Sequence, residues 1–470
     1  MPSSRIWRHP ILEFKRGPKV TFYFNGKPVE AYIGESVAAA LHAAGFYAVR
    51  GDYPPEGLFC MIGKCSSCLV RVNGVPHVRA CREPVRDGLV VESETSRPRI
   101  PPPYDGGYPE VEKLNVDLLV VGGGPAGLSA ATVAARAGLN VLLVDEHFRV
   151  GGQLVKQTHK FFGSREFFGG FRGFQIASLL EDEALRAGVK ILLETTAYGW
   201  FREGVVGLAS RGKRYEVKAK TIVVSTGAHE RFIPFPGNML PGVMGAGAAQ
   251  TLMNEYGVKP GDRALVVGAG NVGLIVSYQL LQAGVSVAAV IEIMREIGGW
   301  FVHAAKLRRY GVPILTGHTI IEAKGDGKVE RAVVAPVDDN FRPIGEKAFE
   351  MPCDLVLLAV GLTPDSRLLA QMGAKMMWVP ELGGLVPLRD EYMETSIPGV
   401  YVAGDAGGIE EATTAIITGR IAGLSAAIRV LGPQPRLVEE RERAIKMLEE
   451  CRRTPFSSKI LRGLAEVRVR

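Results

Sequence analysis

Residues 116–146 read VDLLVVGGGPAGLSAATVAARAGLNVLLVDE, and residues 263–292 read RALVVGAGNVGLIVSYQLLQAGVSVAAVIE. Each stretch has an apolar run, a glycine-rich turn, a helix-forming segment, a glycine stop and a second apolar run. This pattern predicts a β-strand, an α-helix and a second, parallel β-strand. Because it occurs twice, the sequence predicts two dinucleotide-binding domains and an α/β fold.

The first of these stretches carries a dinucleotide-binding fingerprint. Its first glycine permits a tight turn, its second lets a pyrophosphate approach the backbone, and its third lets the helix pack against the strand. The start of the helix directs free N–H groups at the phosphates, and an acid after the second strand is placed to bind the ribose hydroxyls. The candidate binding residues are Gly122, Gly124, Pro125, Ala126, Gly127, Asp145 and Glu146.

Two later segments favour FAD over NAD at this first site. A two-glycine turn at residues 151–152 follows the ribose acid and can pass beneath a flavin. In residues 399–423 a buried strand ends at Asp405, which can accept a hydrogen bond from the ribityl chain, and a helix then begins near residue 412. Its N-terminus can stabilise negative charge on a reduced flavin. The further candidate FAD-binding residues are Gly152, Gln153, Thr226, Gly227, Gly404, Asp405, Ala412 and Thr413.

The second stretch repeats the fingerprint with a different acid. A glutamate at its end favours NAD over NADP, because it would repel a 2′-phosphate, although Arg295 nearby weakens that preference. Two alternatives stay open, namely an adenine nucleotide bound without hydride transfer and an empty scaffold. The candidate residues are Gly268, Gly270, Asn271, Gly273 and Glu292.

Four of the six cysteines lie close together near the N-terminus. Cys60, Cys65, Cys68 and Cys81 have the spacing C-x4-C-x2-C-x12-C. The first part of that spacing is the one that ferredoxins use for a [2Fe–2S] cluster. Zinc is the competing interpretation, but C-x4-C is atypical of zinc knuckles.

The segment around these cysteines, residues 19–90, predicts a small, mostly β unit. Asn25-Gly26 predicts a hairpin, residues 37–44 predict a helix that Gly45 ends, and residues 69–72 and 89–92 predict strands. A turn at residues 72–74 is expected to bring Cys81 back to the other thiols. The region resembles the β-grasp ferredoxin domain.

Composition excludes several classes of protein. The chain has 470 residues and a formal net charge of +7, from 56 Lys and Arg against 49 Asp and Glu. The basic excess forms no aromatic-interleaved stripe, so no nucleic-acid partner is expected. The N-terminus lacks the apolar core of a signal peptide, and residues 116–144 are interrupted by glycines and Arg136, so no transmembrane segment is expected. The cysteines do not form a secreted disulfide scaffold, which favours the cytoplasm.

The expected domain order is a ferredoxin-like unit followed by a flavoprotein whose NAD-type domain is inserted in its FAD-type domain. The expected boundaries are 1–95 for the [2Fe–2S] ferredoxin-like domain, 96–115 for a proline-rich linker, 116–245 for the first half of the FAD-binding domain, 246–385 for the NAD(P)-type domain, 386–432 for the second half of the FAD-binding domain and 433–470 for a C-terminal helical tail.

Three stretches make the resemblance specific. GGQLVKQTHKFFGS (151–164), GAHERFIPFPGNMLPGVMGAGAAQTL (227–252) and EEATTAIITGRIAG (410–423) look like the α subunits of heteromeric sarcosine oxidase, opine oxidase and dye-linked L-proline dehydrogenase. The resemblance covers residues 20–430. It implies a partner β subunit that oxidises the substrate, room for further small subunits, and an FMN at a subunit interface. Relatives of the opine-oxidase type carry a further C-terminal cysteine cluster, where this chain has only Cys451.

The expected function is that of an FAD-dependent oxidoreductase subunit in an amino-acid or amine dehydrogenase complex of the L-proline, sarcosine or opine type. It would pass electrons between the partner's flavin, its own FAD and a [2Fe–2S] cluster. Disulfide reduction is disfavoured, because Cys353 and Cys451 lie far apart in the sequence. Lys156, His159 and His229 receive no catalytic role. Two alternatives remain, a stand-alone NADH dehydrogenase (diaphorase) and an assembly subunit that binds an adenine nucleotide structurally.

Overall fold

The chain divides into two compact units. The computed structural model describes residues 4–51, 55–94, 110–162, 166, 168–201, 204–454 and 457–468. Unit 1 comprises Met1–Pro103 and Glu230–Gly361, and unit 2 comprises Tyr104–His229 and Leu362–Arg470. The ferredoxin-like domain and the second nucleotide-type domain therefore belong to one unit, and the FAD-type domain makes up the other.

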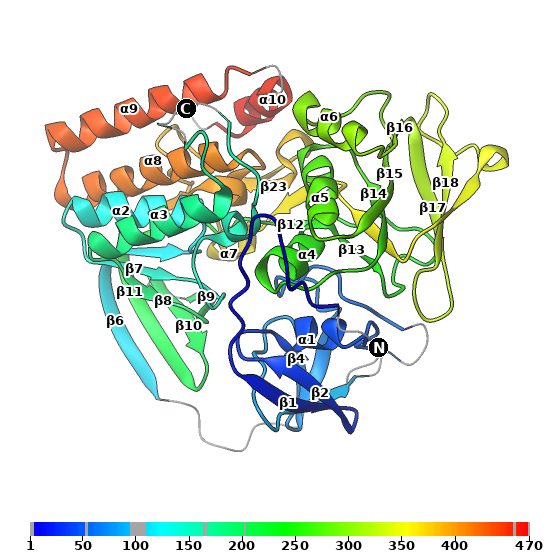
Figure 1. The fold of residues 1–470 in the computed structure, drawn as a ribbon. Helices are drawn as coiled ribbons and strands as arrows, with labels where there is room; N and C mark the ends of the chain where they lie inside the picture. Colours follow the sequence, from blue (N-terminus) through cyan, green and yellow to red (C-terminus); the bar gives the residue numbers. More distant parts are fainter. Residues whose placement is uncertain are drawn as a thin grey trace. The chain divides into compact units, whose positions relative to one another are not determined.

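The ferredoxin-like domain of unit 1 is a five-stranded sheet with one helix (Figure 1). The sheet order is β2-β1-β5-β3-β4. Asn25 and Gly26 both have positive φ, 48° and 76°, and form the predicted turn between β1 and β2. The Ser36 hydroxyl caps the helix by accepting the N–H of Ala39 at 3.2 Å. The elements are β1 (Lys19–Phe24), β2 (Lys27–Tyr32), α1 (Val37–Ala43), β3 (Leu69–Val72), β4 (Val75–Arg79) and β5 (Val90–Ser93).

The second nucleotide-type domain of unit 1 is a parallel sheet of five strands in the order β13-β20-β14-β15-β16. A three-stranded antiparallel sheet, β17-β18-β19, is inserted in the chain between β16 and β20 of the parallel sheet. The strands are β13 (Val243–Gly245), β14 (Arg263–Val267), β15 (Ser286–Glu292), β16 (Ile314–Thr316), β17 (His318–Lys324), β18 (Arg331–Pro336), β19 (Phe349–Pro352) and β20 (Leu355–Leu358). The helices are α4 (Ala246–Gln250), the π-helix η4 (Thr251–Glu255), α5 (Asn271–Gln282) and α6 (Phe301–Arg309).

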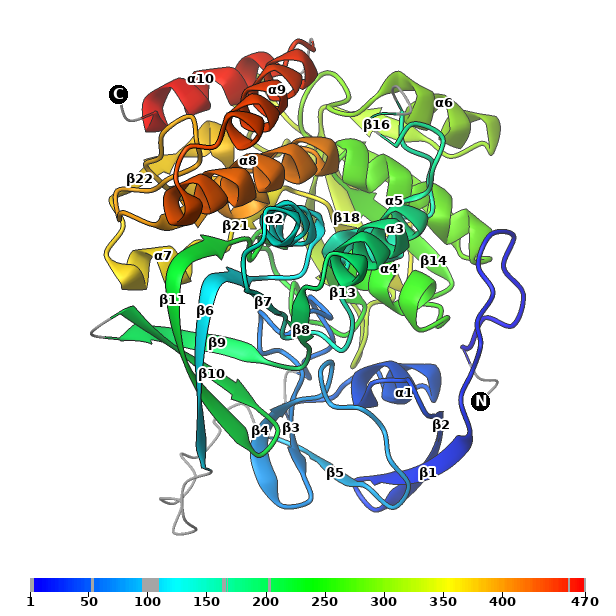
Figure 2. The ribbon, with the colours of Figure 1, turned by 90° about the vertical axis from the view of Figure 1, so that its left-hand side faces the viewer.

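Unit 2 is built on a seven-stranded sheet with helices packed against it (Figure 2). Strands β8, β7, β6, β11 and β24 are parallel, and the antiparallel strands β10 and β9 extend the sheet from β11. The strands are β6 (Val111–Val121), β7 (Val141–Val144), β8 (Lys190–Leu192), β9 (Thr196–Phe201), β10 (Val205–Ser210), β11 (Lys213–Val224) and β24 (Val400–Val402). The helices are α2 (Pro125–Arg136), η1 (Gly152–Lys156), α3 (Gly173–Arg186), α7 (Arg367–Met372) and α8 (Ala412–Leu431).

Helices α2 and α8 of unit 2 approach each other at glycines. A Cβ atom on Gly419 would lie 2.1 Å from the carbonyl oxygen of Ala126, and one on Gly423 would lie 2.3 Å from that of Ala130. Because no larger residue fits there, these glycines let α8 cross the helix that carries the first fingerprint. In the described part of the chain, α8 is also the one helix long and apolar enough to cross a membrane, but 72% of its most apolar window is buried within the fold.

The C-terminal tail folds back onto unit 2. Within the expected helical tail of residues 433–470, the first helix is α9 (Pro435–Cys451), and it lies alongside α8 (Figure 2). The second helix of the tail is α10 (Ser457–Val467). Gly463 of α10 packs tightly enough that a Cβ would lie 2.8 Å from Glu381 and 2.9 Å from Leu382.

The observed domain boundaries differ from the expected ones at residues 115, 245 and 385. Strand β6 begins at Val111, so residues 111–115 belong to the sheet, while residues 96–109 of the expected linker lie outside the described residues. Strand β13 pairs with β20 and therefore belongs to unit 1, which resumes at Glu230. Residues 362–385 belong to unit 2, where Gln371 exchanges two hydrogen bonds of 2.8 Å with the Trp200 backbone. The short strands and loops between the two βαβ repeats have no hydrophobic periodicity, so the sequence pattern could not locate these domain boundaries.

Candidate cofactor sites

The four clustered cysteines lie in a tightly curled loop and on the hairpin that follows it. Met61, Gly63 and Ser66 have φ of 54°, 77° and 62°. Two of these three residues carry side chains in a left-handed conformation that costs about 1 kcal/mol or more each, and such strain is concentrated at functional sites. The N–H of Ala80 donates to the Cys68 carbonyl at 2.9 Å, so the β3–β4 hairpin returns Cys81 to the loop as predicted.

The thiols are arranged as two pairs. The thiol of Cys60 interacts most strongly with that of Cys65, and the thiol of Cys68 with that of Cys81. Donation from the Cys60 thiol lowers the pKa of Cys65 to about 6 and raises that of Cys60. Donation from Cys81 likewise lowers the pKa of Cys68 and raises its own. Cys65 and Cys68 therefore lose their protons more readily than their partners do.

This pairing fits two irons better than one zinc. A [2Fe–2S] cluster takes its four thiolates as two on each iron, which matches two thiol pairs. Cys65 is exposed while its three companions are buried, so one edge of such a cluster would lie close to solvent.

The first fingerprint brings its glycines to the close approaches that their predicted roles require. A Cβ on Gly122, where φ is +107°, would lie 2.4 Å from the Ser225 carbonyl oxygen, and one on Gly127 would clash with Gly122 itself. Gly124 is the N-cap of α2, and a Cβ there would meet no atom closer than 4.0 Å. Within the described structure no side chain caps this helix. The space beside Gly124 and the free N–H groups of the first turn suit a pyrophosphate.

The acid of the first site stands at the end of β7. Asp145 accepts hydrogen bonds from the N–H of Gly123 at 2.6 Å and from that of His147 at 2.7 Å. These bonds fix the carboxylate beside the glycine turn. Glu146, the neighbouring candidate, takes part in an interaction with another group.

The other candidate FAD residues belong to the same unit and follow its strands. Gly151 and Gly152 have φ of 106° and 53°, and a Cβ on Gly152 would lie 2.9 Å from the Cα of Gly124. The two-glycine turn containing Gly152 and Gln153 therefore lies beside the phosphate turn. Thr226 and Gly227 follow β11 and bind the Asp365 backbone, through the Thr226 hydroxyl and the Gly227 carbonyl.

Asp405 is a half-buried carboxylate that accepts a backbone hydrogen bond. Burial raises its pKa to about 7, and the N–H of Glu410 reaches its Oδ1 at 3.3 Å. The preceding residue, Gly404, has φ of 65° and donates to the Thr418 hydroxyl at 3.0 Å. A hydroxyl of a ribityl chain is a suitable donor for such a carboxylate.

Helix α8 begins at Ala412, as predicted. Glu411 and Thr414 form a capping box in which the Glu411 side chain accepts the N–H of Thr414. That bond leaves the two preceding N–H groups, of Ala412 and Thr413, at the helix end. They are the groups that the sequence assigns to the flavin.

The second fingerprint in unit 1 repeats this geometry. A Cβ on Gly268, with φ of +109°, would lie 2.4 Å from the Ala359 carbonyl oxygen, and one on Gly273 would clash with the Gly268 carbonyl. Gly270 is the N-cap of α5, which no side chain caps in the described structure, and a Cβ there would meet nothing within 4 Å. The site therefore keeps the open approach to the helix N-terminus that a dinucleotide needs. Asn271, the first residue of α5, accepts the N–H of Trp300 on its side chain at 2.8 Å.

A second two-glycine turn completes this repeat and was not part of the sequence prediction. Gly298 and Gly299 follow β15, and a Cβ on Gly299 would lie 2.8 Å from the Asn271 nitrogen. The sequences HFRVGG (147–152) and MREIGG (294–299) hold corresponding places after their acids. Aligning them would have revealed this turn.

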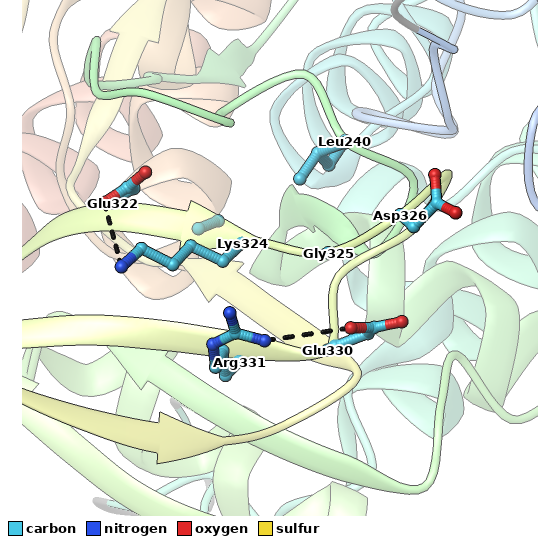
Figure 3. Close-up of a pocket in the computed structure, with 8 residues that line it drawn as sticks. Leu240, Glu322, Lys324, Gly325, Asp326, Glu330 and Arg331 are labelled. Atoms are coloured by element: carbon cyan, nitrogen blue, oxygen red, sulfur yellow. Dashed lines mark ion pairs between the residues drawn. The ribbon is translucent and has the colours of Figure 1, made fainter.

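A separate surface pocket of about 480 Å³ lies near β17 and β18 (Figure 3). Its charged side chains pair with one another, Lys324 with Glu322 at 3.5 Å and Arg331 with Glu330 at 3.8 Å. Glu350 binds both of these basic groups at 3.1 Å. Neither fingerprint lines this pocket, so it is separate from the two candidate nucleotide sites.

Fold and sites define a flavin- and iron–sulfur-dependent oxidoreductase. Residues 116–419 match the pyridine nucleotide-disulphide oxidoreductase family, to which this chain belongs. Residues 17–96 match the 2Fe-2S iron-sulfur cluster binding domain. FAD and a [2Fe–2S] cluster are thus the cofactors that the two families imply, and the loop of four thiols and the unit 2 fingerprint fit them.

Curated relatives share most of this architecture. The chain is 30% identical to the HcnB subunit of hydrogen cyanide synthase from Pseudomonas aeruginosa over 72% of its own length and 77% of the relative's. It is 28% identical to the alpha subunit of sarcosine oxidase from Corynebacterium sp. strain P-1, covering 89% of this chain but 44% of that one. It is 30% identical to an opine oxidase subunit of Agrobacterium tumefaciens, covering 66% and 65%. The chain thus spans less than half of that sarcosine oxidase subunit.

A solved structure agrees with this relationship. The crystal structure of L-proline dehydrogenase from P. horikoshii matches 94% of this chain and 79% of its own, with a TM-score of 0.70 and 28% identity. Thioredoxin reductase from T. acidophilum matches 67% of the chain with a TM-score of 0.55 and 24% identity, which shows the shared flavoprotein fold. The resemblance inferred from the sequence to the sarcosine oxidase, opine oxidase and L-proline dehydrogenase group is confirmed.

Proposed function

We propose that this chain is the electron-transfer flavoprotein subunit of a heteromeric amino-acid or amine dehydrogenase. The observation that carries the proposal is that one chain holds both an FAD-type site and a paired-thiol [2Fe–2S] site. FAD accepts two electrons as a hydride and an iron–sulfur cluster passes them singly. The exposed Cys65 edge supports delivery of electrons to an acceptor outside the chain.

Disulfide chemistry, which the family name includes, has no support in the remaining thiols. Cys353 is 3% exposed in the core of unit 1, and burial raises its pKa to about 11. Burial also raises the pKa of Cys451, at the end of α9. Reactive cysteines have lowered pKa values, so these two thiols are structural.

A partner β subunit would oxidise the substrate and hand electrons to this chain, with an FMN at the interface as a candidate intermediate carrier. The relatives are themselves named as subunits, of sarcosine oxidase, opine oxidase and hydrogen cyanide synthase. Sarcosine, an opine or L-proline is the substrate class that these names and the L-proline dehydrogenase structure support. Four crowded thiols that must stay reduced before cluster assembly favour the cytoplasm.

The open space at Gly270 and the acid at Glu292 favour a second candidate function. Together they suit NAD(H), or another adenine nucleotide, in unit 1. A chain that oxidised NADH there would act as a diaphorase. A chain that held the nucleotide without oxidising it would use unit 1 for assembly.

An anaerobic absorbance titration of the purified chain separates these functions. The as-purified spectrum is expected to show flavin and cluster bands, and co-expression with the partner is expected to make both bleach on addition of the partner's substrate. Bleaching of the isolated chain by NADH would instead establish the diaphorase. Bound adenine nucleotide with no NADH oxidation and no bleaching by a partner would establish the assembly role. A spectrum without cluster bands would overturn the assignment of the four cysteines.

A further inference from the structure

The loop that joins β24 to α8 in unit 2 contains the candidate flavin carboxylate. It runs from residue 404 to residue 411 and includes a short 3-10 helix, η7 (Gly404–Gly407). The loop contains three glycines, at 404, 407 and 408, so few of its own side chains can hold its backbone in place. Such a loop needs outside contacts to hold Asp405 in place.

The C-terminal tail supplies the strongest of these contacts. Arg452, the C-cap of α9, donates to both carboxylate oxygens of Glu410, at 2.9 and 2.7 Å. The two side chains are 17% and 9% exposed, so this bidentate pair is largely shielded from solvent. The backbone N–H of the same Glu410 is the group that approaches Asp405. Glu410 is therefore the single residue that connects the ion pair of the tail with Asp405, the candidate flavin-binding carboxylate.

A second arginine, Arg389, contacts the loop at Gly407. Arg389 is 7% exposed and donates to the Gly407 carbonyl oxygen at 2.6 Å. Its own backbone N–H donates to the carbonyl oxygen of Val467 in α10 at 3.1 Å. Both tail helices thus connect to the loop, α9 through Arg452 and α10 through Arg389.

We propose that helices α9 and α10 clamp the flavin-binding loop, with Arg452 as a positioning residue that acts through Glu410 on Asp405. The family match ends at residue 419, inside α8, so the tail lies beyond the matched segment. Removing one member of a shielded ion pair leaves the other charge unpaired, and the loop then moves to rehydrate it. This inference rests on the assignment of Asp405 to the FAD site.

The test compares Arg452→Ala with Arg436→Ala in the complete chain. Arg436 lies at the opposite end of the same helix and pairs with Glu440 at 2.9 Å, and its side chain is 78% exposed. We expect Arg452→Ala to weaken FAD binding about tenfold, within the range by which a connected residue modulates a binding site. Arg436→Ala should bind FAD as the unmodified protein does. Fluorescence titration of the apoprotein with FAD gives both dissociation constants.

Three further measurements keep the proposal distinct from a general loss of structure. The unfolding midpoint of the Arg452→Ala apoprotein should fall more than that of Arg436→Ala, because Glu410 loses a shielded partner, so FAD affinity is compared well below both midpoints. Arg452→Lys, which keeps a charge, should restore part of the affinity. In a chain that already carries Glu410→Gln, adding Arg452→Ala should cause little further loss of FAD affinity. Equal FAD affinity in the two alanine variants, or additive effects in the double variant, would overturn the clamp. An unmodified chain that binds no FAD would overturn the flavin assignment itself.

Discussion

The carboxylate of Glu292 accepts a hydrogen bond of 2.7 Å from the backbone N–H of Ala269, inside the second glycine turn. Its other oxygen accepts the N–H of Met294 at 3.0 Å. Asp145 makes the same two bonds in the other unit, to Gly123 and His147. Both fingerprints therefore share the glycine turn and the acid that accepts its N–H group. FAD is the expected ligand in unit 2, and NAD(H) or another adenine nucleotide is the proposed ligand in unit 1. The second site therefore repeats the backbone geometry of the first.

The glycines of the second site allow binding and folding to be separated by mutation. We expect Gly270→Ala to leave unfolding unchanged, because its methyl group meets nothing within 4 Å, but to weaken NADH or ATP binding about tenfold. Gly268→Ala should instead cost about 3 kcal/mol of stability, since its φ is +109° and its methyl would lie 2.4 Å from a carbonyl oxygen. Urea unfolding and calorimetric titration of each variant measure the two effects. Unchanged nucleotide binding in Gly270→Ala would mean that no phosphate approaches the start of α5.

Local patterns predicted the two βαβ repeats, the cysteine loop, the Asn25-Gly26 hairpin and the start of α8, because each depends on residues adjacent in the chain. The start of unit 1's second segment at Glu230 was not predicted, since β13 is short and is defined only by pairing with β20 more than 100 residues later. The tail contacts were missed for the same reason. Arg452 and Glu410 are 42 residues apart, and nothing in either sequence neighbourhood indicates the other.

Replacing one clustered thiol should remove the cluster without removing the flavin. Cys81→Ser breaks the buried Cys68–Cys81 pair, and we expect loss of the cluster's visible bands and of bound iron while FAD is retained. Cys451→Ser is the matched control and should keep both, because that thiol belongs to α9 in unit 2. Iron analysis and absorbance spectra test this. Zinc in place of iron in the purified, anaerobically prepared chain would contradict the pairing argument.

The N-terminal arm, residues 4–18, should detach when its central carboxylate is lost. Glu35 binds Arg5 twice at 2.8 Å and Arg16 at 3.1 Å, and Arg16 also donates to the Gly257 carbonyl oxygen at 3.0 Å. Because all three charges are buried, Glu35→Ala leaves two arginines unpaired and should cost about 3–5 kcal/mol. Faster amide exchange and proteolysis of the arm would accompany this loss.

The matched control for the arm is Glu30→Ala. Glu30 pairs with Lys19, but the two side chains are 67% and 54% exposed. Exposed ion pairs contribute about 1 kcal/mol or less, so this variant should unfold like the unmodified protein. Similar destabilisation by both variants would show that the buried ion pairs do not anchor the arm.

Asp405 should make the stability of the apoprotein fall as pH rises. Burial raises its folded-state pKa from the ordinary 3.8 to about 7, so between these values the folded state binds a proton that the unfolded state has released. The stabilising contribution of that proton is fully present below about pH 4 and is lost as pH rises through about 7. Asp405→Asn removes the titration. The stability of this variant relative to the unmodified apoprotein should therefore increase by an amount on the order of 1 kcal/mol when the pH is raised from 5 to 8. Urea unfolding of both apoproteins at these two pH values measures the difference. Adding FAD should reduce the change of this difference with pH, because a ribityl hydroxyl would stabilise the charged carboxylate. A stability difference that changes with neither pH nor FAD would place Asp405 outside the flavin site.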